Sequence, residues 1–259
     1  MRKTFLPPAA ALVFGAAGFG LRLWGLRTAF EPDTGLPIPG APATVSLIVL
    51  TIAVLLLLGG VLWRMCRSVP VLSYDDAFRC EAPAAVTADV VCALLLVGGG
   101  LLGLWDCVQG SAPNLAYPVL DALLVASGGC VLLTGRNNYR GQGQGKFNAY
   151  LLFPAYTFCL WLVLSYQAQA GNPVVLDYVY RILAIICSLL GLYFTASFSF
   201  EKGKALPTLW TGLAAVYFSC VCLADFSGWM DLALHAFSIV YFTAHSVVLL
   251  RNLTAEREE

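Results

Sequence analysis

Residues 175–200, VLDYVYRILAIICSLLGLYFTASFSF, form an apolar stretch with an aspartate and an arginine in its first two turns. A helix of this length crosses the hydrocarbon core of a bilayer, which is about 30 Å thick. At 100° per residue, one side of the helix carries Asp177, Arg181, Ala184, Ser188, Gly191 and Thr195. The opposite side carries Val179, Leu183, Ile186, Leu190 and Tyr193. We therefore predict a transmembrane helix with one side toward protein or water and the other toward lipid.

The composition extends this prediction to the whole chain. Hydrophobic residues make up 59% of the 259 residues and charged residues 12%, whereas about 25% of the residues of a soluble domain are charged. Apolar runs of about 20 residues recur along nearly the whole length. The sequence predicts an all-α fold, a polytopic membrane helix bundle that forms a single integral membrane domain over residues 1–259. We expect eight transmembrane helices at about residues 5–24, 43–63, 85–107, 118–133, 149–168, 175–199, 207–226 and 231–250.

Three segments have two interpretations each. Residues 5–24 follow Arg2 and Lys3 and resemble a cleaved signal peptide, but the length of the apolar run favours a retained helix with small residues for close packing, Gly15, Gly18 and Gly20. For the polar segment around Asp75, Asp76 and Arg79 we favour a solvated loop over a short interfacial helix. Residues 136–148, RNNYRGQGQGKFN, contain glycines before Lys146, but we predict a flexible basic loop because Phe147 stands where a phosphate-binding loop needs Ser or Thr.

Basic residues are concentrated on one side of the membrane in an eight-helix topology. That side collects Arg2, Lys3, Arg64, Arg67, Arg79, Arg136, Arg140, Lys146, Lys202, Lys204, Arg251 and Arg257. The other side has Arg22 and Arg27, and Arg181 lies within its half of the membrane. Because basic loops stay in the cytoplasm, we predict a multi-pass protein of the plasma membrane with both termini cytoplasmic.

Carboxylates are concentrated on the outer side. These are Glu31, Asp33, Asp106, Asp121, Asp177, Asp225 and Asp231. Most lie near predicted helix ends, where a carboxylate is also an ordinary cap favoured by the helix dipole. Arg181 needs a partner, since an arginine at the bilayer centre costs on the order of 3 kcal/mol. We expect that partner to be Asp177, four residues earlier, either as a structural ion pair or as part of a binding cavity.

The last predicted helix carries a second polar stripe. Asp231, His235, Ser238, Phe242 and His245 project to one face, and the two histidines are the only ones in the chain. Buried histidines are usually hydrogen-bonded core residues, and a proton relay or polar cavity is the alternative. His235 and His245 lie roughly 15 Å apart and cannot share a metal. Asp231 with His235 lacks a third ligand, and Cys220 and Cys222 project to different faces, so we expect neither a metal nor a cofactor.

One stretch resembles a known pattern. FPAYTFCLWLVLSYQAQAGNPVVLDYVYRIL, continuing to LYFTASFSF, is similar to uncharacterised polytopic integral membrane proteins of anaerobic Gram-positive bacteria. The resemblance covers about a quarter of the chain and includes no catalytic motif. It implies a bacterial plasma membrane and no particular activity.

Three classes of function fit these observations. We favour a small-solute or ion transporter, or the membrane-embedded substrate-binding subunit of one, that takes its ligand from the outer side at Asp121, Asp177, Arg181, Asp225, Asp231 and His235. The alternative is a non-enzymatic sensor, receptor or scaffold with a cytoplasmic protein partner. An intramembrane enzyme is third, because we identify neither a nucleophile with its base nor three metal ligands. The lipid bilayer is an expected partner and nucleic acid is not.

Overall fold

A computed structural model describes residues 2–31, 36–67, 73–80, 82–110, 115–141, 148–226 and 228–255. Eight helices in these ranges are long and apolar enough to cross a membrane. They are α1 (Arg2–Thr28), α2 (Pro42–Cys66), α4 (Pro83–Val108), α5 (Ala116–Arg140), α6 (Phe153–Gln169), α7 (Val175–Ser197), α8 (Ala205–Cys222) and α9 (Trp229–Ala255). A short helix, α3 (Tyr74–Phe78), and two 3₁₀ turns, η1 (Ala149–Leu151) and η2 (Phe198–Phe200), complete the helical elements of the described ranges. The all-α fold with eight candidate transmembrane helices is confirmed.

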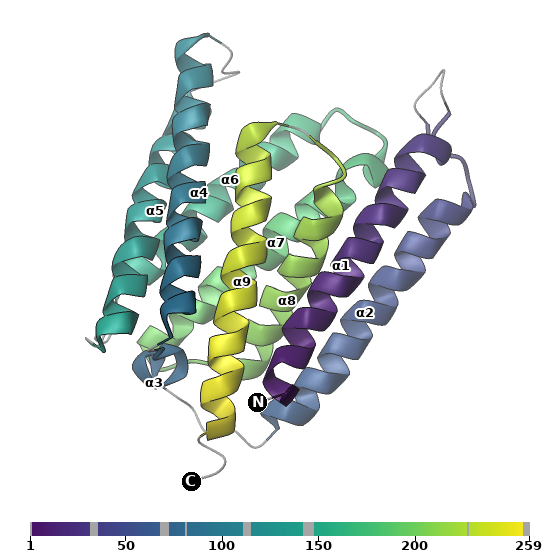
Figure 1. Cartoon of the computed structure of the whole chain (residues 1–259). Coiled ribbons are helices and arrows are strands. Elements are labelled where there is room, and N and C mark those ends of the chain that lie inside the picture. The colour runs from purple at the N-terminus through teal and green to yellow at the C-terminus, as the bar shows by residue number, and fades with distance from the viewer. Residues whose placement is uncertain are drawn as a thin grey trace.

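The eight helices form one bundle with both chain ends at the same end of it (Figure 1). We call this end the terminal side and the other the opposite side. The α4–α5 hairpin lies at one edge of the bundle, and α1 with α2 lies at the other (Figure 1). Helix α8 is central, since it packs against α1, α2, α7 and α9. Its 18-residue span is 78% buried, compared with 28% for the most apolar part of α2.

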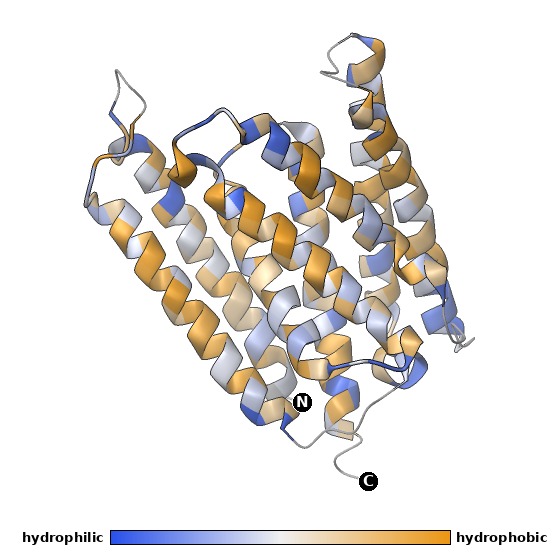
Figure 2. Ribbon diagram, turned by 180° about the vertical axis from the view of Figure 1, so that it is seen from behind, coloured by the Kyte–Doolittle hydropathy of each residue, from blue (hydrophilic) through white to orange (hydrophobic). Residues whose placement is uncertain are grey.

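The outward faces of the helices suit lipid. Hydrophobic residues cover most of the length of the helices, and hydrophilic residues lie mostly toward the ends of the bundle (Figure 2). Large apolar side chains such as Val13, Leu56 and Leu94 are exposed on the protein surface. Such a surface is expected when the surrounding solvent is hydrocarbon.

The two predicted faces of α7 are confirmed. Ser188 and Thr195 are buried within the bundle, whereas Leu190 and Tyr193 are exposed. The buried face meets the polar stripe of α9, where Ser188 Oγ donates a hydrogen bond to Ser238 Oγ at 3.0 Å. The two stripes found in the sequence therefore do face each other.

Glycines allow neighbouring helices to approach closely. A Cβ added at Gly15 would lie 2.8 Å from Cys220 Cβ, and one at Gly18 would lie 2.7 Å from Val221 Cγ2, so both glycines pack α1 against α8. Gly20, which we expected to share this role, has no atom of another residue within 4 Å of such a Cβ. Between α4 and α5, a Cβ at Gly128 would lie 2.9 Å from the Ala93 carbonyl oxygen.

Some local predictions were wrong. The segment that we assigned to a solvated loop forms helix α3, where the Ser73 hydroxyl accepts a hydrogen bond from the Asp76 amide at 3.3 Å. Buried Tyr74 and Phe78 hold this helix against the bundle. Helix α5 continues to Arg140 rather than ending near residue 133, because its polar last turns project beyond the apolar stretch. Of the predicted flexible loop 136–148, residues 136–140 instead belong to α5, and residues 142–147, with Lys146, lie outside the described residues.

Substitution of Gly128 by alanine tests the close contact between α4 and α5. Gly128→Ala forces a methyl group against the backbone of α4 and should cost about 1–3 kcal/mol of stability. Gly129→Ala is the matched control, since Gly129 is exposed and a methyl group added there would have no atom of another residue within 4 Å. The thermal midpoint of the detergent-purified protein should fall for Gly128→Ala only. Equal midpoints for the two variants would contradict this packing.

Candidate functional site

A cavity of about 310 Å³ opens on the opposite side of the bundle, between the ends of α4, α5, α6, α7 and α9. Its lining includes Gly103, Asp106, Cys107, Tyr117, Asp121, Trp161, Ser165, Arg181, Trp229 and Asp231. Small-molecule sites usually measure roughly 300–1,000 Å³, so this volume suits a small solute. Three carboxylates and one guanidinium group line it.

Arg181 and Asp231 form an ion pair at one wall of this cavity. Arg181 Nη2 donates to Asp231 Oδ2, and the Trp161 indole donates from Nε1 to Asp231 Oδ1 at 3.2 Å. Both oxygens of this buried carboxylate therefore have a partner. The Arg181 Nε is buried and has no hydrogen-bond partner, so the guanidinium keeps donor capacity.

The predicted pair between Asp177 and Arg181 was wrong. Asp177 is exposed, and its carboxylate accepts a hydrogen bond from Asn172 Nδ2 at 3.0 Å. Asn172 also closes the turn before α7, because its Oδ1 accepts from the Val174 amide at 2.9 Å. Asp177 thus lies in the solvent-exposed first turn of α7, whereas the side chain of Arg181 points inward toward α9.

Asp121 borders the cavity and is only 1% exposed. Its Oδ2 accepts a weak hydrogen bond from the Cys107 thiol at 3.4 Å, and its buried Oδ1 has no hydrogen-bond partner. The carboxylate packs directly against Gly103 of α4, where any Cβ would overlap Oδ1. The interpretation of Asp121 as a helix cap is wrong, because it lies inside α5 rather than at its first residues. A buried acceptor with spare capacity is costly unless a ligand or proton satisfies it.

His235 lies one turn beyond Asp231 on α9, on the inward side of the cavity. Its ring is buried beside the Trp161 indole, with 5.4 Å between ring centroids, and its Nδ1 has no hydrogen-bond partner. A void of about 10 Å³ borders both His235 and Asp231. His235 therefore adjoins the cavity without lining it.

Asp225 belongs to a separate structural ion pair. It lies beyond the end of α8, which stops at Cys222 rather than at the predicted residue 226. Arg22 Nε lies 3.0 Å from each oxygen of Asp225. The other two nitrogens of Arg22 donate to the backbone carbonyls of Leu176 at 3.0 Å and Asp177 at 2.9 Å. This buried arginine thus joins α1 to the ends of α7 and α8 and has no free donor nitrogen for a ligand.

The structure therefore brings together half of the predicted site residues. Asp121, Arg181 and Asp231 line one cavity, His235 adjoins it, and Asp177 and Asp225 lie outside it. Sequence reasoning missed the aromatic wall, above all Trp161. A signal for it was present, since Trp161 and Ser165 are one turn apart in a predicted span at the depth of the carboxylates.

Comparisons with known proteins do not assign the chain to a family. Neither protein-family models, nor curated proteins, nor solved structures gave a match. Within the described ranges, no group of three or more His, Cys, Asp or Glu side chains is arranged to hold a metal ion.

Removal of the Arg22 guanidinium should destabilise the bundle. Arg22→Gln leaves the partly buried Asp225 and two carbonyls without their donor, which typically costs about 3–5 kcal/mol. Arg27→Gln on the same helix is the control, because Arg27 is exposed. We expect a marked fall in the thermal midpoint for Arg22→Gln and little change for Arg27→Gln. If Arg22→Gln melts like the unsubstituted protein, the structural role of this ion pair is refuted.

Proposed function

We propose that this integral membrane protein is a transporter, or the membrane-embedded binding subunit of one, for a small cationic solute that enters from the opposite side. The observation that carries the proposal is the buried Asp121 carboxylate, which borders the 310 Å³ cavity and has one oxygen without a hydrogen-bond partner. Ionisable groups inside a membrane bundle usually mark a ligand or ion pathway.

The charged side chains that line the cavity indicate that the solute is a cation. Arg181 is paired with Asp231, which leaves Asp106 and Asp121 without a cationic partner among the lining side chains. A small ammonium group would supply both the positive charge and the hydrogen-bond donors that Asp121 lacks.

Aromatic rings support an organic cation rather than a bare metal ion. Tyr117, Trp161 and Trp229 line the same cavity, and aromatic faces attract ammonium groups through cation–π interactions. A carboxylate and aromatic rings that line one cavity form a site in which an amine is held by charge and its carbon atoms by apolar contact.

Binding of simple amines tests this proposal. Ethylamine, ethanolamine, putrescine and tetramethylammonium are titrated separately into the detergent-purified protein, and the thermal midpoint is followed. We expect at least one of them to stabilise the protein in a saturable manner. Asp121→Asn should weaken that binding roughly 10- to 150-fold, as for loss of a hydrogen bond to a charged group.

Asp177→Asn is the matched control, because Asp177 is an exposed carboxylate outside the cavity. It should bind the amine as the unsubstituted protein does. If no amine stabilises the protein, or Asp121→Asn binds as tightly as Asp177→Asn, the site is assigned wrongly. Uptake of the bound amine into proteoliposomes separates a transporter from a sensor, which would bind without uptake.

We also propose that the terminal side faces the cytoplasm of a bacterial cell. The ends of helices and connections on the terminal side carry the described basic residues Arg64, Arg67, Arg79, Arg136, Arg140, Lys202, Lys204 and Arg251. Basic residues flanking transmembrane helices favour the cytoplasm. The cavity then opens to the outside.

Reporter fusions to the full chain check this orientation. Green fluorescent protein after Glu259 should fluoresce in a bacterial host, and alkaline phosphatase at the same place should be inactive, since each folds on one side only. Alkaline phosphatase inserted into the connection 111–114, between α4 and α5, should be active. The reverse pattern would contradict the orientation.

A further inference from the structure

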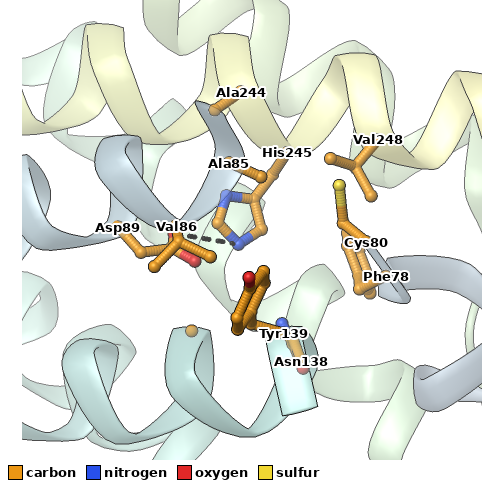
Figure 3. A pocket seen from close by; sticks show the side chains of 11 residues that line it. Phe78, Cys80, Ala85, Val86, Asp89, Asn138, Tyr139, Ala244, His245 and Val248 are labelled. Carbon is orange, nitrogen blue, oxygen red and sulfur yellow. Dashed lines mark ion pairs between the residues drawn. The ribbon is translucent and has the colours of Figure 1, made fainter. Parts of the chain in front are cut away.

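A second polar site lies in the terminal half of the bundle, between α4, α5 and α9. Asp89 of α4 is buried, and its Oδ1 lies 3.8 Å from His245 Nε2 of α9 (Figure 3). The Asp89 carboxylate packs on the backbone of α5, where a Cβ at Gly135 would lie 2.5 Å from Oδ2. Voids of about 20 and 10 Å³ flank the pair, and both border Asp89, Gly135 and His245.

The hydrogen bond on the far side of the imidazole determines its tautomer. His245 Nδ1 lies 3.1 Å from the carbonyl oxygen of Tyr241, and a carbonyl oxygen only accepts, so Nδ1 carries a hydrogen. Nε2 of a neutral His245 would then present a lone pair toward Asp89. A lone pair facing a carboxylate is repulsive, and one proton between them removes the repulsion. The contact thus favours one bound proton, either on Nε2, which gives an ion pair, or on Asp89, which gives a neutral pair.

Phenol and thiol groups surround the pair. The titratable side chains that face it are Cys92 of α4, Tyr74 of α3, Cys80 after α3, Tyr139 of α5, Tyr150 of η1 and Tyr241 of α9. Burial raises the pKa of Tyr74 well above its usual range, although a hydrogen bond from Asn138 opposes the shift. Asp89 and His245 are thus the carboxylate and the imidazole of a cluster whose other titratable members are phenols and thiols.

Aromatic rings enclose the pair, and a void large enough for one water molecule adjoins it. Tyr241 stacks on the His245 ring with 3.9 Å between centroids, and Phe78 of α3 packs beside it at 5.8 Å. Asn252 holds α3 in place, since its Nδ2 donates to the carbonyls of Ala77 at 2.9 Å and Arg79 at 3.0 Å. The 20 Å³ void exceeds the roughly 10–15 Å³ that one water needs, and it borders Tyr139, which is exposed at the terminal side.

We propose that Asp89 and His245 form a proton-binding site that exchanges its proton with water on the terminal side. Binding makes an N–H bond at His245 Nε2 or an O–H bond at Asp89, and release returns the proton to solvent. The site goes beyond the solute cavity, because His245 lies fourteen residues along α9 from Asp231, roughly 21 Å away. Both sites use α9, so a proton bound near one end changes the charge of the helix that lines the cavity at the other.

Histidine NMR tests this proposal, since the chain has only two histidines. The ¹⁵N-histidine-labelled His235→Gln protein in nanodiscs reports His245 alone, and its ring shifts are followed against pH. We expect Nδ1 to stay protonated while Nε2 titrates. Asp89→Asn in the same background should lower the proton affinity of His245 by roughly tenfold or more, because it removes the facing negative charge. Asp177→Asn, at an exposed site on α7, should leave the titration unchanged.

Identical His245 titrations with and without the Asp89→Asn substitution would overturn the proposal, as would the absence of any pH-dependent change at both His245 Nε2 and the Asp89 carboxyl group. A second measurement applies if Asp89→Asn fails to fold. The infrared C=O stretch of protonated carboxylic acids is compared between the unsubstituted protein and His245→Gln across the same pH range. We expect the pH dependence of one carboxyl group to change in His245→Gln. If it does not change, Asp89 and His245 do not form one proton-binding site. Neither readout requires a solute, so a failure of amine binding remains distinguishable.

Discussion

A charged side chain inside a bilayer needs polar partners from the protein itself, and this requirement determines how the helices of the bundle pack. Arg22 is only 4% exposed, and all three of its nitrogens contact Asp225 or backbone carbonyls. Arg181 is joined to Asp231, and Trp161 completes the partners of that carboxylate. Since hydrocarbon supplies no hydrogen bonds, these contacts determine which helix ends meet on the opposite side. The cavity lies among them.

Features that depend on a single helix were predicted from the sequence, whereas contacts between two helices were not. Apolar length gave the eight spans, and periodicity gave the buried face of α7 with Ser188. The partner of Arg181 was missed because spacing shows which residues meet along one helix, whereas Asp231 comes from another. For the same reason Trp161 was missed. Asp121 was identified as a candidate, but its burial against Gly103 required the packing of α4 on α5.

The α4–α5 hairpin holds two buried carboxylates in reciprocal positions. Asp121 of α5 packs on Gly103 of α4 near the opposite side, and Asp89 of α4 packs on Gly135 of α5 near the terminal side. In each case a glycine removes the side chain that would occupy the place of the carboxylate. The hairpin thus supplies an acid to each end of the bundle, and α9 supplies the facing residues Asp231 and His245. Two sites on two sides therefore share the same three helices.

The ion pair between Arg22 and Asp225 also constrains how the chain is made. These residues are 203 positions apart, so the ribosome completes α1 long before it reaches the carboxylate that neutralises it. At a rate of synthesis of roughly 5–20 residues per second, about 10–40 s pass between the synthesis of Arg22 and that of Asp225. During this interval α1 also lacks α8, against which Gly15 and Gly18 pack. Helix α1 can pack against α2 during this interval, but its buried arginine has no carboxylate partner until Asp225 has been made.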